Sequence, residues 1–339
     1  MDILENYSLK ELNSFSISAN SRYFVVLDKV EEIQEFLEMD QYRGLSRLVL
    51  GGGSNILLSG NFDGITVKVD VTGKELLQED DNYFYVKAGA GESWHQFVLY
   101  CIENGYSGIE NLSLIPGNLG AAPMQNIGAY GVELKDVFHE LQAVRIDNGE
   151  CLTFSNSDCK FGYRNSIFKG EAKDQFIITS VTLRFAKQPV FNTSYGNLMQ
   201  ELEAMNAGPL SSKVISDAVC NIRNRKLPNP VEIHNAGSFF KNPIISNELF
   251  EQLKEQYPDI VSFVNSETEV KLAAAWLIDS CGWKGKREGD AGVHEHHALV
   301  LVNYGNSSGS AILNLSLEIA ESVKSKFGIE LEREVNLVE

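Results

Sequence analysis

The chain has 339 residues, more than one hydrophobic core usually serves, so we expect two or three domains. It carries 46 acidic and 29 basic residues, and the resulting formal charge of −17 repels phosphate backbones, which argues against nucleic acid as a partner. No apolar run reaches the length of a membrane span, and the polar start at 1–6 lacks a signal-peptide core. We therefore expect a cytoplasmic protein with no membrane contact.

The first half of the chain alternates predicted strands with predicted helices. Apolar residues at helical spacing predict amphipathic helices at 30–37 and 94–102. The turn Asp147-Asn148-Gly149 separates two apolar runs and predicts a β-hairpin over 141–154. Other apolar or alternating runs predict strands at 23–27, 47–50, 65–71, 83–87 and 176–185.

The second half is different in character. Residues 189–212 are rich in loop-forming residues, and a helix predicted at 214–222 ends before Pro228-Asn229-Pro230, our candidate domain boundary. Further helices are predicted at 248–256, 270–281 and 313–327, and further strands at 297–303 and 329–335. This irregular mixture predicts an α+β fold with several small sheets.

Two glycine-rich segments are suited to holding a ligand. The first is Gly51-Gly52-Gly53-Ser54-Asn55, which follows a predicted strand; extended residues come next, where a dinucleotide-binding fingerprint requires a helix. The second, 115–131, contains four glycines and three side-chain amides but no charged residue. Such loops suit a nucleotide-type cofactor bound by backbone N–H groups, although tight turns in a small sheet would also explain the glycines.

Seven segments in collinear order resemble the UDP-N-acetylenolpyruvoylglucosamine reductase family. The most specific is Asn235–Pro243, which reads NAGSFFKNP, and together the segments cover nearly the whole chain. The others are Gly51–Asn55, Ile115–Gly117, Gln125–Gly131, Phe161–Arg164, Lys226–Pro228 and Leu331–Val335.

The resemblance implies a fold in three parts. An FAD-binding domain of the PCMH or vanillyl-alcohol-oxidase type would consist of two α+β subdomains, at 1–70 and 71–227. A C-terminal α+β substrate-binding domain would follow at 228–333, and the end of the chain, 334–339, could return to the first subdomain.

The resemblance also implies a reaction. NADPH would reduce the enolpyruvyl group of UDP-N-acetylglucosamine enolpyruvate through FAD, giving UDP-N-acetylmuramate for peptidoglycan synthesis. No histidine or cysteine lies between Gly51 and Gly91, so we expect non-covalent FAD. The residues implied in cofactor binding are Gly51, Gly52, Gly53, Ser54, Asn55, Ile115, Pro116, Gly117, Gln125, Asn126, Gly128, Ala129, Tyr130 and Gly131.

Three residues match the family's catalytic positions. Ser238 would donate a proton, Arg164 would bind the substrate carboxylate and steady the enediolate, and Glu334 would orient the substrate or stabilise the enol. A serine hydroxyl is a weak acid, so Lys241 or a water chain could assist it. Taken alone, Ser238 reads as a turn residue, Arg164 as a solvated arginine, and Glu334 as part of the alternating acidic strand 330–334.

The residues implied in substrate binding include a basic group at a helix end. Arg223, Arg225 and Lys226 crowd three positive charges together, which suits either a diphosphate or the helix dipole. His297 stands where the family pattern predicts a glutamine, and the nearby histidines invite a metal interpretation, but no third ligand is evident, so no metal is expected. The implied set is Tyr130, Tyr163, Tyr195 of a mobile tyrosine loop, Arg223, Lys226, Asn242 and His297.

Two other functions remain open at this stage. One is a non-covalent FAD-linked oxidase of the same fold class that acts on a sugar or an alcohol. The other is a nucleotide-binding regulator without turnover. The sequence does not fix NADPH over NADH, and it shows no apolar stripe for assembly, so the expectation is a monomer.

Overall fold

The computed structural model describes residues 1–206 and 208–339, which form two compact units. Unit 1 comprises Met1–Tyr7, Ser21–Gly52 and Asp63–Arg225, and unit 2 comprises Ser8–Asn20, Gly53–Phe62 and Lys226–Glu339. The chain therefore passes between the units several times, and the first glycine segment is divided between them after Gly52.

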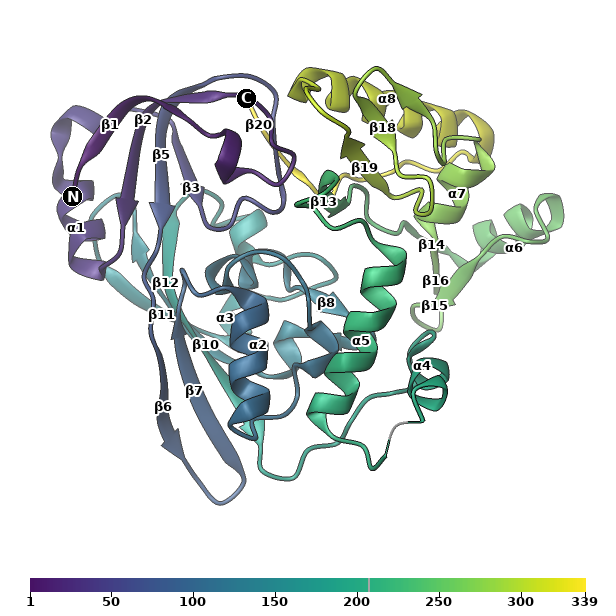
Figure 1. The fold of residues 1–339 in the computed structure, drawn as a ribbon, viewed down its shortest axis with the longest axis horizontal. Coiled ribbons are helices and arrows are strands. Elements are labelled where there is room, and N and C mark those ends of the chain that lie inside the picture. The colour runs from purple at the N-terminus through teal and green to yellow at the C-terminus, as the bar shows by residue number, and fades with distance from the viewer. Residues whose placement is uncertain (207) are drawn as a thin grey trace. The chain divides into compact units, whose positions relative to one another are not determined.

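Unit 1 contains a four-stranded sheet in the order β1-β2-β5-β3, seen in purple and blue in Figure 1. Helix α1 (Val30–Glu38) buries Ile33, Phe36 and Leu37, the face that its apolar spacing predicts. Strand β3 runs parallel to β5, with Arg47 opposite Ile65, and ends directly before the first glycines. The strands are β1 (Ile3–Ser8), β2 (Asn20–Leu27), β3 (Arg47–Leu50) and β5 (Phe62–Val69).

The second sheet of unit 1 has five antiparallel strands in the order β11-β10-β12-β7-β6. The predicted hairpin is confirmed, with Leu141 opposite Phe154. Helix α2 (Trp94–Glu103) buries Trp94, Phe97, Val98 and Cys101, and one apolar core includes residues of both sheets, α1 and α2. The strands are β6 (Lys74–Glu79), β7 (Tyr83–Gly89), β10 (Phe138–Arg145), β11 (Cys151–Ser155) and β12 (Phe176–Ala186).

Shorter elements complete unit 1. Strands β8 (Gly128–Ala129) and β9 (Val132–Glu133) form a small hairpin, and α3 (Asn156–Cys159) follows β11. Helix α5 (Ser212–Lys226), whose last residue is assigned to unit 2, packs with α4 (Leu198–Ala204) around a small core that includes Leu198, Leu202, Ile215 and Ile222.

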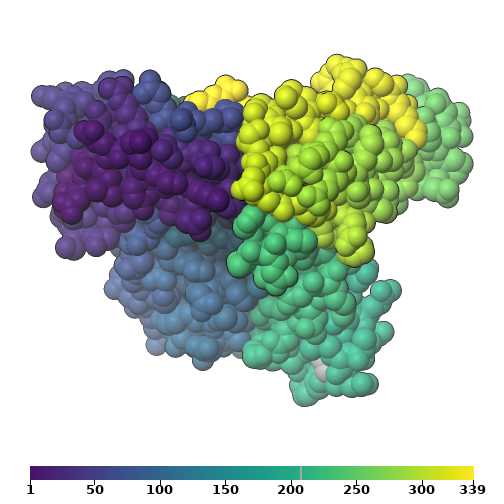
Figure 2. Space-filling model, turned by 45° about the horizontal axis from the view of Figure 1, so that its top comes forward, coloured from purple at the N-terminus to yellow at the C-terminus, as the bar shows by residue number. Residues whose placement is uncertain are grey.

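Unit 2 is built on small antiparallel sheets with helices beside them. One sheet has the order β13-β19-β18-β17, another β14-β16-β15, and β20 pairs in parallel with β4. Its helices are α6 (Asn247–Gln256), α7 (Ala274–Ser280) and α8 (Gly309–Phe327), and α8 is exposed along one face, in yellow in Figure 2. Its strands are β4 (Ile56–Leu58), β13 (His234–Ser238), β14 (Ile244–Ser246), β15 (Ser262–Val264), β16 (Glu269–Leu272), β17 (Arg287–Glu288), β18 (Ala291–Val293), β19 (Val300–Asn303) and β20 (Asn336–Val338).

Several predicted element boundaries in unit 2 are wrong. The helix predicted at 270–281 is strand β16 followed by α7, because an apolar run in a strand merges with the apolar face of the helix. The strand predicted at 329–335 is an extended segment with one isolated bridge, Phe240 to Arg333, and the last strand is β20. Within residues 1–206 and 208–339, no helix has the length and apolarity needed to cross a bilayer.

Gly309, the first residue of α8, lies directly against the end of β4 in unit 2. A side chain there would overlap the carbonyl group of Leu58, so Gly309→Ala should lower the free energy of unfolding by about 1–3 kcal/mol, the usual cost of overpacking. Chemical denaturation of the purified protein measures this. The control is Gly60→Ala in the same unit, where an added Cβ meets nothing within 4 Å; equal losses for the two variants would contradict the prediction.

Candidate functional site

The two glycine loops of unit 1 lie against each other. A Cβ added to Gly52 would lie 2.5 Å from Oδ1 of Asn118 and 3.0 Å from Cα of Gly117. At Gly51 the distance to Cβ of Asn118 would be 3.4 Å. At Gly52 only glycine allows this approach, so the glycines bring two backbone segments together and present backbone at their surface.

The N-terminal turn of α2 holds the second loop in place. The Trp94 backbone N–H donates to the Gly117 carbonyl at 2.9 Å, and the Leu119 N–H donates to the Glu92 carbonyl at 2.8 Å. The Leu114 N–H donates to Nδ1 of His95 at 3.0 Å, which places the proton of the neutral ring on Nε2. Burial, and then the charge of Arg223, lower the pKa of His95, so its neutral form is favoured.

The remaining residues of the first glycine segment belong to unit 2. Gly53 has a positive φ of 60°, and a side chain there would overlap the Leu12 carbonyl. Asn55 donates from Nδ2 to the Glu334 carbonyl at 3.2 Å and accepts from the Asn336 N–H at 3.1 Å. Asn55 therefore fixes the backbone that carries Glu334.

Unit 2 places the segments of Ser238 and Glu334 side by side. Ser238 is the half-buried last residue of β13, opposite Val300 of β19. Immediately after it, the Phe239 carbonyl accepts from the Glu334 N–H at 2.9 Å. Two residues further on, the Lys241 N–H donates to the Glu332 carbonyl at 2.9 Å. Two of the three predicted catalytic residues thus lie beside backbone segments of one unit that are joined by hydrogen bonds.

The third predicted catalytic residue, Arg164, lies in a tight turn of unit 1. Gly162 and Asn165 exchange backbone hydrogen bonds at 3.0 and 3.3 Å, which closes the turn around Tyr163 and Arg164. Arg164 has a positive φ of 51°, donates from Nη2 to the Gly128 carbonyl at 2.6 Å, and stacks over the Tyr163 ring at 5.5 Å. The guanidinium is therefore held against the β8–β9 hairpin.

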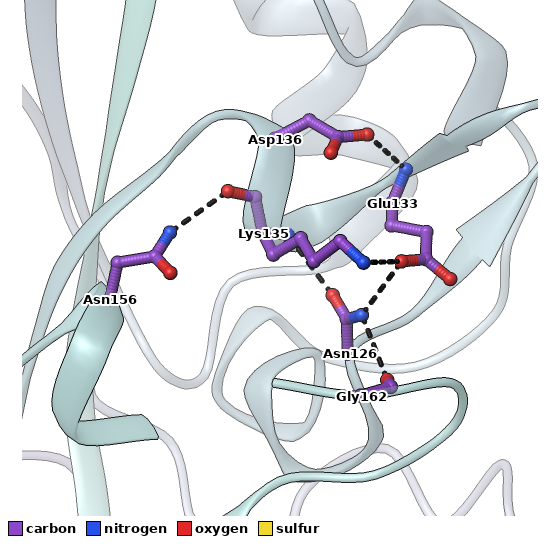
Figure 3. A network of polar contacts seen from close by, with 6 residues as sticks. All are labelled: Asn126, Glu133, Lys135, Asp136, Asn156 and Gly162. Carbon is purple, nitrogen blue, oxygen red and sulfur yellow. Dashed lines mark hydrogen bonds and ion pairs between the residues drawn. The ribbon is translucent and has the colours of Figure 1, made fainter. Parts of the chain in front are cut away.

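Asn126 connects this turn to that hairpin, as Figure 3 shows. Its side chain is fully buried; Nδ2 donates to Oε2 of Glu133 at 3.1 Å and to the Gly162 carbonyl at 3.0 Å. Its Oδ1 accepts from the Lys135 N–H at 3.0 Å. All of these bonds are internal, so we interpret Asn126 as a positioning residue for the Arg164 turn.

The tyrosine loop is bound to the same hairpin within unit 1. Buried Asn111 donates to the carbonyls of Tyr130 and Asn192, both at 2.8 Å, and Asn192 donates to the Gly131 carbonyl at 2.9 Å. A Cβ on Gly131 would lie 3.1 Å from Cβ of Tyr195, whose ring is 47% exposed. Tyr130 and Tyr195 are thus neighbours, and burial raises the pKa of Tyr130.

The two arginines near the end of α5 have different surroundings. Arg225 pairs with Glu201 of α4, whereas Arg223 lies near Tyr130 and His95, and its Nε is shielded from solvent with no acceptor among the described residues. Burial lowers the pKa of Arg223, a sign of the cost of desolvating its charge. Sequence reasoning missed His95, Asn111 and this difference between the two arginines; the available signals were the polar position of His95 in the first turn of an amphipathic helix and the helical spacing of Arg223 and Arg225.

In unit 2, His297 lies close enough to Lys226 for the two charges to interact. Its Nδ1 is buried without a hydrogen-bond partner among the described residues, and burial, His294 and Lys226 lower its pKa in that order. Asn242 uses Oδ1 to accept from the Ala274 N–H at the start of α7, at 3.0 Å. The described residues contain no group of three or more potential metal ligands.

Comparisons with known proteins agree with one another. Residues 21–155 match an FAD binding domain model, and residues 229–338 match the C-terminal domain of UDP-N-acetylenolpyruvoylglucosamine reductase. The reductases of that name from Flavobacterium johnsoniae and Amoebophilus asiaticus are each 49% identical over 339 residues, all of both chains.

Solved structures show a similar fold at lower identity. The reductase of the same name from Thermus caldophilus has a TM-score of 0.66 at 21% identity, over 100% of this chain and 98% of that one. A 4-ethylphenol oxidase from Gulosibacter chungangensis has a TM-score of 0.52 at 10% identity, over 98% and 84%. The α+β fold with a PCMH-type FAD-binding domain is confirmed.

Asn126→Asp tests the buried amide. The variant turns a double donor into an acceptor facing the Glu133 carboxylate and the Gly162 carbonyl, so we expect a loss of roughly 2–4 kcal/mol in the free energy of unfolding. The control is Asn148→Asp, because Asn148 uses only its oxygen, which accepts from the Glu150 N–H at 3.0 Å. Denaturation curves that coincide for the two variants would refute the role given to Asn126.

His297→Gln tests the buried imidazole. The pKa of His297 is lower in the folded protein than in the unfolded chain. As the pH drops below about 6.5, the unfolded chain therefore binds a proton that the folded protein does not, and the free energy of unfolding falls. The variant should therefore lose about 2 °C less in Tm than the parent between pH 7.5 and pH 5. His139→Gln, on the second sheet of unit 1, is the control; an unchanged pH dependence in His297→Gln would count against the assignment.

Proposed function

The chain belongs to the UDP-N-acetylenolpyruvoylglucosamine reductase family, and from this membership we propose how its own residues divide the work. As a flavoenzyme of this family, it reduces the enolpyruvyl group of UDP-N-acetylglucosamine enolpyruvate to UDP-N-acetylmuramate, with NADPH as reductant, in peptidoglycan synthesis. The observation that carries this conclusion is 49% identity over the complete chain. The likeness to an oxidase concerns the fold alone, so the oxidase alternative loses its support.

The glycine surface of unit 1 fits FAD. Gly52 approaches Gly117 and Asn118 at distances that exclude a side chain, and Gly51 lies beside it in contact range of Asn118, which leaves backbone groups to meet a cofactor. We propose that Gly51, Gly52, Ile115, Pro116 and Gly117 hold FAD there. The proposal extends to Gly53, Ser54, Asn55, Gln125, Gly128, Ala129, Tyr130 and Gly131, whereas the Asn126 side chain is occupied internally. When bound, FAD supplies the hydride transfer from NADPH to the substrate.

We propose Ser238 as the proton donor and Glu334 as the residue that orients the substrate. The support is the backbone hydrogen bond between Phe239 and Glu334, which holds the segments of Ser238 and Glu334 together in one unit. The ammonium group of Lys241 forms an ion pair with Glu332 at 2.5 Å, so Lys241 is engaged elsewhere. A water chain is the remaining route for assisting the weakly acidic serine hydroxyl.

We propose Arg164 as the ligand of the substrate carboxylate. Its bond to the Gly128 carbonyl and its stacking on Tyr163 fix the plane of the guanidinium, and a fixed planar fork suits a carboxylate. A group held before the substrate arrives loses little entropy on binding.

We propose that the diphosphate of the substrate meets Arg223, Lys226 and Tyr195, with Asn242 and His297 as further contacts. Arg223 supports this most directly, because its shielded Nε lacks an acceptor and an anionic group would supply one. A substrate contact of Asn242 would come from Nδ2, since Oδ1 caps α7. We further propose that the enzyme works as a cytoplasmic monomer without nucleic acid or membrane partners, in keeping with its small charged reactants.

Ser238→Ala tests whether Ser238 acts in the transfer to the substrate and not in the reduction of FAD by NADPH. NADPH should still bleach the flavin absorbance of the variant, but addition of the enolpyruvyl substrate should no longer restore it, and turnover should fall at least 100-fold because the proton donor is missing. Stopped-flow spectra at 450 nm, roughly where flavins absorb, separate the two half-reactions. Loss of both half-reactions would make Ser238 structural.

Ser266→Ala, an exposed loop serine of unit 2, is the control for Ser238→Ala. The family function itself is tested on the parent protein. A preparation that takes up no FAD, or that oxidises NADPH at the same rate with and without the enolpyruvyl sugar nucleotide, would contradict it.

A further inference from the structure

Unit 1 contains an arginine-lined cavity that the proposed reaction does not use. It has a volume of about 360 Å³ and is lined by Arg43, Arg47, Arg145, Ile146, Asp147, Asp174 and Gln175. Arg47 is the first residue of β3, whereas the glycine loop follows the last, so the cavity lies at the opposite end of that strand from the glycine surface. The other side of the cavity comes from the end of β10 and the start of β12. The cavity therefore joins the two sheets of one unit.

Arg47 is incompletely satisfied in this cavity. Its Nη2 donates to the carbonyls of Tyr42 and Arg43 at 3.4 and 3.2 Å, while its Nε is shielded from solvent and has no acceptor in the part of the chain that the structure describes. Burial, and then the like charge of Arg43, lower the pKa of Arg47. A partly desolvated guanidinium beside a second one is unfavourable unless an anion accompanies it.

Arg145 approaches from the second sheet and is also incompletely satisfied. Its guanidinium lies over the Phe176 ring at 5.2 Å, and its Nε is 3.5 Å from Oε2 of Glu150 but forms no hydrogen bond. The hairpin that carries Arg145 is tied to α1, because Gln34 donates to the Gly149 carbonyl at 2.8 Å. Arg145 is therefore held in place without a full set of acceptors.

The two acidic residues that line the cavity do not neutralise its arginines, whose ion pairs, Arg43 with Asp40 and Arg145 with Glu150, are made with residues outside the lining. Asp147 and Asp174 are both exposed, and within the described part of the chain neither forms an ion pair with the three lining arginines. Arg43 pairs instead with Asp40, at 3.1 Å on the surface. Three cations thus face one space, and two carboxylates at its edge remain available to accept hydrogen bonds.

We propose that this cavity binds a small phosphorylated molecule that carries hydroxyl groups. Arg47 and Arg145 bind the phosphate, turning so that Nε and Nη donate together, and Arg43 adds charge. Asp147 and Asp174 accept hydrogen bonds from the hydroxyls. The volume is at the small end of the range for ligand sites, so it suits a sugar phosphate and excludes a dinucleotide. The site is separate from the proposed diphosphate contacts Arg223 and Lys226.

The test is calorimetric titration of the FAD-loaded enzyme with ribose 5-phosphate and with inorganic phosphate, at constant ionic strength. We expect saturable binding of both, with ribose 5-phosphate the tighter ligand because of its hydroxyls. Arg47→Gln and Arg145→Gln should each raise the Kd at least tenfold. Arg145→Lys, which keeps the charge but loses the planar fork, should raise it less. In phosphate-free buffer, kcat and KM should stay within twofold of the parent values, which shows that the variants are folded.

Two further variants locate the binding. Arg22→Gln removes an exposed arginine of the same unit, paired with Asp63 at 3.3 Å, and should leave the Kd unchanged. Lys226→Gln removes a proposed substrate contact and should also leave it unchanged. Binding that persists in Arg47→Gln and Arg145→Gln but is lost in Lys226→Gln would assign the phosphate to the substrate site and overturn the proposal. No saturable binding up to 10 mM, roughly the limit of a meaningful affinity for such a ligand, would also overturn it.

Discussion

The buried amide of Asn126 is the constraint on which the proposed site in unit 1 depends. It faces two acceptors and one donor, and a side-chain amide is the group of that size that can satisfy all three at once. Its backbone has a φ of 45°, a conformation that asparagine adopts more readily than most residues. The Arg164 turn and the β8–β9 hairpin are therefore fixed relative to each other by a side chain whose three hydrogen bonds are internal to unit 1.

Unit 2 fixes its part of the site by a different means. The backbones at 239–241 and 332–334 share hydrogen bonds, although about 90 residues separate them in the chain. Closing such a long loop costs entropy, which the buried Phe239 and Phe240 side chains offset by packing into the interior. The backbone holds the register here, through the hydrogen bonds that join Phe239 to Glu334 and Lys241 to Glu332. Unit 1 positions its arginine through side chains, and unit 2 positions its serine and glutamate through the main chain.

Local periodicity was enough to predict much of the fold. The helices at 30–37, 94–102 and 313–327 correspond to α1, α2 and α8, because their apolar faces recur at 3.6-residue spacing. Strand β20 carries no local signal, since it pairs in parallel with β4 across 280 residues; only the family resemblance implied that 334–339 could return towards the N-terminal part of the chain. The three internal hydrogen bonds of Asn126 could not be predicted either. Two of its partners, the Gly162 carbonyl and the Lys135 N–H, are backbone groups, and Gly162 is also distant in the chain. In contrast, the division between Arg223 and Arg225 could have been predicted: residues two apart on a helix point to opposite sides, and buried Ser216 and Val219, seven and four residues before Arg223, mark its side as the buried one.

The strongly acidic composition does not conflict with a reaction among anions. At physiological ionic strength a charge is screened over about 8 Å, so the net charge of −17 governs solubility and slows non-specific encounters but acts little at contact. What binds an anion is a guanidinium at hydrogen-bond distance in a partly desolvated site, where screening is weak. Among the described residues of unit 1, three arginines, Arg47, Arg145 and Arg223, have an Nε that is shielded from water and lacks an acceptor. A buried guanidinium nitrogen without an acceptor lowers the stability of a protein, and an anion that binds it relieves that cost. An acidic protein can therefore be selective for particular anions, because it repels anions in general and attracts them only where an arginine is left unsatisfied.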